Sequence, residues 1–336
     1  MLPHPKWEPP YPAYAAAFAP EVRHVVMAYY GVSYSGDAPP AARAFAVRLQ
    51  AALQGPNAPA VANRARHQTK SGRTEDVFIL YWLDPGTFQA WQKDFDTWWH
   101  GPARLNEDVG YWCEIFSPPL ARLETLISSE TPAGLAEAMT GATGPIREHA
   151  YWGAMRDRIP LSASDALVSA QADLQPHDPG DTLGKRLRIV MPENVCLIRS
   201  GQNFTDCGPE EADIYHAKVG PVLAAGMTYL RDHPLETGCL SCRFMSETAV
   251  GGAAEKKTFG LAYFLSMAHL EAWAANHPTH LAIFRTFHEL VRARNFVLDL
   301  KLWHEVAVIP QNGGVADYIN CPPDTGLLPH LPATPF

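Results

Sequence analysis

Apolar residues follow two patterns along the first part of the chain. Runs of β-branched and aromatic residues, such as EVRHVVMAYYGVSY at 21–34, are typical of buried strands. Between these runs, apolar residues recur at helical spacing, and prolines stand where helices would begin. The pattern predicts strands at 21–34, 76–83 and 111–118, helices at 39–54 and 85–99, and a polar loop at 55–75.

Similar patterns return later in the chain. Two short helices are expected near 119–140, and the polar stretch 145–190 is predicted to be a long functional connection. The pattern then predicts strands at 194–201, 239–246, 258–266 and 298–309, and helices at 209–232 and 267–295. Residues 1–20 are rich in proline and aromatic residues, which predicts an extended arm over the body or a partner subunit. A tail at 316–328 ends the chain.

Short sequence matches relate the two halves. The pattern YWL followed by Ala-Trp at 81–91 recurs with identical spacing as YFL followed by Ala-Trp at 263–273. A Trp-x-Glu-apolar sequence occurs at 112–115 and again at 303–306. These matches indicate an internal duplication.

Repeated β-α-β units imply an α+β fold. We expect two tandem ferredoxin-like modules, of the dimeric α+β barrel type, whose antiparallel strands form a barrel-like core flanked by helices. Residues 1–144 would form the first module with its extended N-terminal arm. Residues 145–336 would hold the connecting active-site segment and the second module, and together they would make one compact unit.

Composition narrows the class of partner. Of 336 residues, 47 % are hydrophobic and 18 % charged, which suits a globular protein with ample core material. The net charge of −8, without a Lys/Arg run, argues against nucleic acid or an anionic membrane as partner. No stretch resembles a signal peptide or a membrane span, so a cytoplasmic location is expected.

The six cysteines do not suggest a disulfide framework. Cys239 and Cys242 form a CxxC sequence, but no second pair stands at zinc-site spacing. Arg243 follows, where covalent haem attachment would need histidine. A structural role is therefore the better interpretation of these thiols.

Candidate chemistry gathers at 276–306, which holds four of the fourteen histidines: His277, His280, His288 and His304. Scattered histidines are often surface or core groups, and spacing alone does not separate that interpretation from a metal site. The comparison of the two halves favours a site, because His280 falls opposite Trp98 and His304 falls opposite Cys113. Only the second half carries imidazoles at these places, as a site in one half requires.

The surroundings of these two histidines suggest a cofactor. His280 opens an apolar helix with Phe284 and Phe287, which suits a flat porphyrin better than a hydrated divalent ion. A neutral imidazole there would bind iron, and His304, on a strand, could donate and accept protons on the open side. Four further polar residues could converge on the same place, although each alone is more often an ordinary cap, ion pair or surface group: Glu124, Arg156, Arg158 and Ser200.

Several of these segments together resemble the aldoxime dehydratases, haem-dependent enzymes that make nitriles. The resemblance rests on EHAYWGAMRDRIPLS at 148–162, LIRSGQ at 197–202, HPTHLAIF at 277–284, LWHEVAV at 302–308 and ADYINCPPDTGLL at 316–328. The matches occur in order over nearly the whole chain. The family resemblance implies an α+β-barrel-like fold, haem b active as Fe(II), an aldoxime substrate and a homodimer.

The same resemblance assigns roles by position. His280 corresponds to the proximal haem ligand and His304 to the distal catalytic histidine. The active-site arginine corresponds to Arg158 rather than Arg156. Ser200 corresponds to the serine that bonds the aldoxime hydroxyl, and Glu124, in a weakly matching segment, to the glutamate that supports the distal histidine.

The implied reaction is R–CH=N–OH → R–C≡N + H₂O. Two other functions stay open from the sequence: a haem peroxidase or chlorite-dismutase-like enzyme, and a non-catalytic haem-binding sensor. Nothing in the sequence distinguishes aliphatic from arylaliphatic aldoximes.

Overall fold

The computed structural model describes residues 7–336. Its strands are β1 (Ala15–Ala17), β2 (Val26–Tyr34), β3 (Val61–Gln68), β4 (Thr74–Trp82), β5 (Gly110–Phe116), β6 (Leu123–Ile127), β7 (Gly141–Thr143), β8 (Arg186–Val190), β9 (Cys196–Asn203), β10 (Cys239–Thr248), β11 (Ala254–Phe264), β12 (Lys301–Val308), β13 (Gly314–Ile319) and β14 (Thr334–Pro335). Its helices are α1 (Pro40–Ala52), α2 (Pro85–Trp99), α3 (Ala154–Arg158), α4 (Pro209–Ile214), α5 (Gly220–Asp232), α6 (Pro234–Thr237), α7 (Met267–Asn276) and α8 (Pro278–Ala293).

Local sequence explains where the principal helices begin. Pro85 follows Asp84, whose carboxylate accepts the backbone N–H of Thr87 at 2.7 Å and caps α2. Ser266 caps α7, and the ring of His277 caps α8 by accepting from Thr279. The predicted helix at 85–99 is confirmed, whereas the one predicted at 209–232 is α4, a π-helical turn and α5 in succession.

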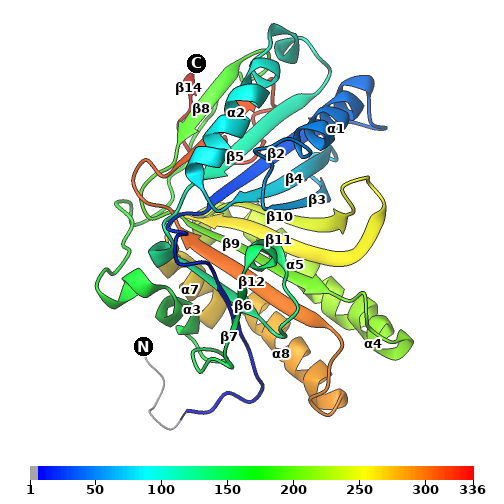
Figure 1. Ribbon diagram of the computed structural model, residues 1–336, viewed down its shortest axis with the longest axis vertical. Helices are drawn as coiled ribbons and strands as arrows, with labels where there is room; N and C mark the ends of the chain where they lie inside the picture. Colours follow the sequence, from blue (N-terminus) through cyan, green and yellow to red (C-terminus); the bar gives the residue numbers. More distant parts are fainter. Residues whose placement is uncertain (1–6) are drawn as a thin grey trace.

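Twelve strands form one antiparallel sheet in the order β14-β8-β13-β5-β2-β4-β3-β10-β11-β9-β12-β6. β1 and β7 pair separately, which lays residues 15–17 of the expected N-terminal arm along the body; residues 1–6 of that arm lie outside the described part of the chain. Figure 1 shows α1 and α2 beside the strands of the first half, and α5, α7 and α8 beside those of the second. The α+β class is confirmed, with a large antiparallel sheet.

The expected barrel does not close in the part of the chain that the structure describes. β14 and β6 are the two edges of the sheet, and they do not pair with each other. The four-strand repeats β2–β5 and β9–β12 are joined in the sheet by the pairing of β3 with β10. The sheet instead folds over, so that Tyr263 of the second half packs on Phe116 of the first at 5.4 Å between ring centroids.

Strand order is the same in the two halves. Counting strands in chain order, β5-β2-β4-β3 reads fourth, first, third, second, and so does β12-β9-β11-β10. The register also agrees. Gly31 lies opposite Trp112 in one half and Gly201 opposite Trp303 in the other, and a Cβ on either glycine would overlap that indole.

Seven of the strands in residues 7–336 were not expected from the sequence: β1, β3, β6, β7, β8, β13 and β14. Three of them show why. β3 was predicted to be a loop because its sequence, VANRARHQ, is mostly polar; its Arg64 pairs with buried Asp76 of β4. β6, with the sequence LETLI, is too short to show periodicity and was predicted as helix. β13 was predicted as a tail.

Strands also cross the boundary expected at 144/145. β6 lies before it and pairs with β12, while β8, β13 and β14 lie after it and extend the sheet beyond β5. No helix in residues 7–336 is long and apolar enough to cross a membrane.

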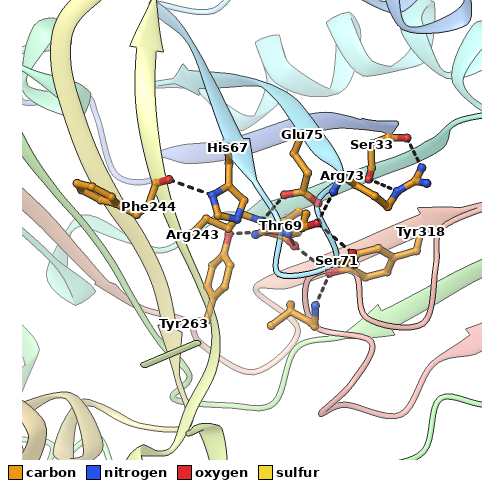
Figure 2. Close-up of polar contacts among 12 residues, drawn as sticks. Ser33, His67, Thr69, Ser71, Arg73, Glu75, Arg243, Phe244, Tyr263 and Tyr318 are labelled. Carbon is orange, nitrogen blue, oxygen red and sulfur yellow. Dashed lines mark hydrogen bonds and ion pairs between the residues drawn. The ribbon is translucent and has the colours of Figure 1, made fainter. Parts of the chain in front are cut away.

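Charged side chains are buried where the halves face each other. The guanidinium of Arg243 binds both oxygens of Glu114 at 2.9 Å and Glu75 at 3.0 Å. Figure 2 shows Arg243 beside Glu75, with Tyr263 extending toward it from its own strand. Because the partners satisfy one another, these charges are tolerated away from water.

Candidate active site

Two adjoining cavities lie between the outer face of the second-half sheet and helices α5 and α8. Their volumes are about 480 and 680 Å³, in the range of pockets that hold small molecules and cofactors. Both are lined by the predicted site residues Ser200, His280 and His304. Side chains far apart in sequence thus share one space.

His280 lies in the first turn of α8, with its ring at 4.7 Å from Trp273 and 5.9 Å from Trp152 between centroids. Burial of the imidazole lowers the pKa of His280. The ring is therefore neutral at neutral pH, the form that ligates metals. Its Nδ1 is buried without a hydrogen-bond partner in the described structure, which leaves Nε2 as the nitrogen open to the cavity.

The neighbouring histidines have other surroundings. His277 caps α8 and lies 3.6 Å from Glu236. His288 packs against Phe284, with 4.2 Å between ring centroids. Neither lines the cavities that hold His280 and His304.

His304 belongs to a row of residues that crosses three strands. It lies opposite Ser200 of β9, which lies opposite Gly260 of β11. The row that corresponds in the first half is Cys113, Tyr30 and Phe78, in the same register. The second half therefore carries smaller residues at two of three places.

This exchange explains the cavities under the helices of the second half. In the first half, Tyr30 packs against Trp91, Phe95 and Trp99 of α2 with ring centroids 5.1–5.6 Å apart and fills the space under the helix. Ser200 cannot fill the equivalent space. Gly260 leaves room for Met227 of α5, since a Cβ there would lie 2.6 Å from the Met227 sulfur.

Gly260 was not recognised in the sequence as a site residue. The alignment of 81–91 with 263–273 places it opposite Phe78, so the loss of a large side chain was the available signal. Trp152 and Trp273, which flank His280, were not recognised either.

Arg158 and Glu124 approach His304 from two elements. Arg158 ends the short helix α3, which starts after Gly153 in the left-handed region (φ +94°). Its Nε and Nη2 donate to the two oxygens of Glu124 at 2.8 and 3.2 Å, and Nη1 donates to the carbonyl of Glu148 at 2.6 Å. Glu124 lies on β6, which pairs with β12 and so brings the carboxylate to the same face as His304.

Arg156 lies elsewhere. Its guanidinium binds Glu271 at 2.6–3.2 Å and the carbonyl of Ala166 at 2.9 Å. Of the two arginines in this helix, Arg158 is the one within hydrogen-bonding distance of His304.

The carboxylate of Glu124 is ionised throughout the neutral range. Burial alone would raise its pKa, but Arg158 and then His304 outweigh burial and lower the pKa to about 2. A permanent negative charge is thus held beside the imidazole.

Nε2 of His304 lies beside one hydrogen-bond donor and one hydrogen-bond acceptor. It lies 2.7 Å from Nη2 of Arg158, which can only donate, and 3.0 Å from Oε1 of Glu124, which can only accept. When Nε2 carries a proton, it donates a hydrogen bond to Glu124. When Nε2 is unprotonated, it accepts a hydrogen bond from Arg158. Nδ1 has no partner among the described residues and is free for a substrate.

These surroundings fit a haem group. Besides His280, the cavity walls are mainly apolar, with Leu223, Met227, Ile283 and Phe284. Residues 7–336 contain no cluster of three or more His, Cys, Asp or Glu side chains suited to a metal ion, so an iron bound by His280 would need further ligands of its own, as a porphyrin supplies.

Comparison with known proteins agrees with this geometry. The family model of the haem-containing dehydratases matches residues 28–327. A phenylacetaldoxime dehydratase of Bacillus sp. (strain OxB-1) is 38 % identical over 331 residues, covering 96 % of this chain and 92 % of its own. An aliphatic aldoxime dehydratase of Pseudomonas chlororaphis is 35 % identical, with the same coverage.

Solved structures give the same result. A crystal structure of an aldoxime dehydratase matches with a TM-score of 0.90 and 34 % identity, covering 98 % of this chain and 94 % of that one. A second, of an aldoxime dehydratase in complex with butyraldoxime, matches with a TM-score of 0.91 and 31 % identity, covering 99 % and 93 %.

Proposed function

The chain belongs to the haem-containing dehydratase family, and on this premise we propose that it is a lyase that converts aldoximes to nitriles and water. The observation that carries the proposal is the shared space. His280 opens to the same cavities as Ser200 and His304, and Arg158 and Glu124 stand behind His304.

We propose that His280 holds haem b through Nε2, with the iron in the ferrous state. Haem would supply an iron that takes up the oxime nitrogen and lends electron density as the N–O bond breaks. Support comes from the neutral, buried imidazole between Trp273 and Trp152.

His304 would carry the proton transfers. Hydroxide is a poor leaving group, so protonated His304 donates its Nδ1 proton to the oxime oxygen, and water departs. Its Nε2–H meanwhile stays bonded to Glu124, 3.0 Å away. The emptied Nδ1 then takes the proton from the oxime carbon, which restores the protonated ring. Each turnover is balanced in protons.

Ser200 and Arg158 would hold the oxime oxygen. Ser200 lies directly opposite His304 on the next strand, and Arg158 lies 2.7 Å from the imidazole. Hydrogen-bond donors fixed before reaction need no rearrangement as negative charge develops on oxygen. Glu124 orients both Arg158 and His304.

We also propose the finer fold assignment, two tandem ferredoxin-like modules. Its support is the shared strand order and the shared Gly–Trp register of the halves. The homodimer implied by the family resemblance stays a prediction.

The comparisons favour aldoxime dehydration over a peroxidase or chlorite-dismutase-like activity and over a sensor. The decisive experiment is anaerobic. The haem-loaded protein is reduced with dithionite and mixed with an aliphatic and an arylaliphatic aldoxime, and nitrile is measured by gas chromatography. Nitrile from either substrate supports the proposal. Turnover of hydrogen peroxide without nitrile, or carbon monoxide binding without nitrile, would overturn it.

A further inference from the structure

Behind the cavity wall lies a second pair of residues. Strand residues alternate between faces, so Arg199 and Glu305, the neighbours of Ser200 and His304, point away from the cavity. They lie opposite each other across β9 and β12. Both are buried in the space between the halves, with 0 % and 1 % of their surface exposed.

Tyr81 of the first half reaches across to this pair. Its hydroxyl donates to Oε1 of Glu305 and accepts from Nη1 of Arg199 at 3.1 Å. The other carboxylate oxygen accepts the backbone N–H of Leu135 at 2.7 Å. Within residues 7–336, Oε1 has no second hydrogen-bond donor, so Tyr81 is the link between Glu305 and Arg199.

We propose that Tyr81 is a positioning residue for the dehydration, which fixes β9 against β12 and with them the spacing of Ser200 and His304. The inference rests on the proposed function of these two residues. A shift of about 1 Å between reacting groups can lower the rate on the order of 10²-fold. A hydrogen bond on the buried face of the sheet can therefore affect the reaction on the cavity face. The link is rigid because every member is buried and hydrogen-bonded.

The molecule provides a matched comparison. Tyr263 of the second half donates across to Glu114 of the first at 2.7 Å, and Glu114 stands next to Cys113 as Glu305 stands next to His304. Tyr263 is as buried as Tyr81. It therefore makes the same kind of bond between halves, but behind a wall that has no cavity in front of it.

The matched variants are Tyr81→Phe and Tyr263→Phe in the full-length, haem-loaded protein. Each loses one buried hydroxyl, so we expect both to lower Tm. Only Tyr81→Phe should lower kcat, by about tenfold, with KM within about twofold, because substrate binding is retained while the donor geometry is relaxed. The C–O stretching band of the ferrous carbon monoxide adduct, which senses polar groups beside the ligand, should shift or broaden in Tyr81→Phe alone.

Equal kcat values and unchanged bands in the two variants would reduce Tyr81 to a structural role and overturn the inference. Absence of nitrile from the unsubstituted protein would instead overturn the proposed function, and the band comparison would still test Tyr81. If Tyr81→Phe does not fold, Glu305→Gln weakens the same link, and a lower kcat with a shifted C–O band relative to Tyr263→Phe is again expected.

Discussion

Glu124 and His304 lie 3.0 Å apart, carboxylate oxygen to Nε2, on strands that pair directly. Replacing Glu124 by Gln removes the charge that favours protonated His304 and leaves Arg158 without its ion-pair partner. We expect kcat to fall roughly 10²-fold, as for loss of a proton-transfer step, with haem content unchanged. A wild-type kcat in Glu124→Gln would show that Glu124 does not support His304.

The same carboxylate makes stability depend on pH in the acid range. The pKa of Glu124 is about 2 against a usual 4.5, a difference that corresponds to about 3 kcal/mol. Because the folded pKa is the lower one, this stability is fully present above about pH 4.5 and is lost as the pH falls through 2. Urea unfolding of the wild type and Glu124→Gln should therefore differ by a constant amount at pH 6–8 and converge below about pH 4.5. Glu255, a partly exposed carboxylate that pairs with Lys257 at 2.7 Å, is the control, and Glu255→Gln should give curves parallel to wild type.

His280 is expected to be required for haem, and His304 for turnover. His280→Ala should bind haem weakly or not at all, measured by Soret absorbance after reconstitution, because the imidazole proposed to bind the iron is then missing. His304→Ala should keep the Soret band and lose nitrile formation. His288→Ala is the control for His280→Ala, since it removes an imidazole two turns further along α8. Wild-type turnover in His304→Ala would exclude the acid–base assignment.

Two substitutions of Ser200 test separately its hydrogen bond to the oxime oxygen and the space that its small side chain leaves for haem. Ser200→Ala removes one hydrogen bond to the oxime oxygen, so kcat should fall by about 10- to 100-fold while haem binding is retained. Ser200→Tyr introduces the residue that stands at the corresponding place in the first half, Tyr30, and should fill the cavity. Reconstitution with haem should then fail although the protein folds, judged by circular dichroism. Normal haem uptake in Ser200→Tyr would show that the hollow does not depend on this residue.

Sequence patterns predicted the long, regular elements because each buries one continuous apolar face. α2 and β4 are examples. The patterns failed where tertiary partners decide the structure. β3 is a strand because Arg64 and Arg66 pair with Asp76 of β4, which no local periodicity reveals. β6 exists because its five residues complete an edge beside β12.

The site residues also divide into those that the sequence could indicate and those that only tertiary packing brings together. His280 and His304 stood out because the other half lacks imidazoles at both places. Arg156 and Arg158 lie two residues apart in one short helix, so the contact of Arg158 with His304 depends on how α3 packs. Glu124 comes from the strand that was predicted as helix, and only its pairing with β12 brings it to His304.

The exchange of strands across residues 144 and 145 bears on how the protein unfolds. A fragment ending at 144 would lack β8 and β13, leaving β5 as a bare edge, and the remaining fragment would lack β6 beside β12. Each fragment would also lose the partner of a buried tyrosine, Tyr81 or Tyr263. We therefore expect the two repeats to unfold in one cooperative transition, and neither fragment to fold by itself.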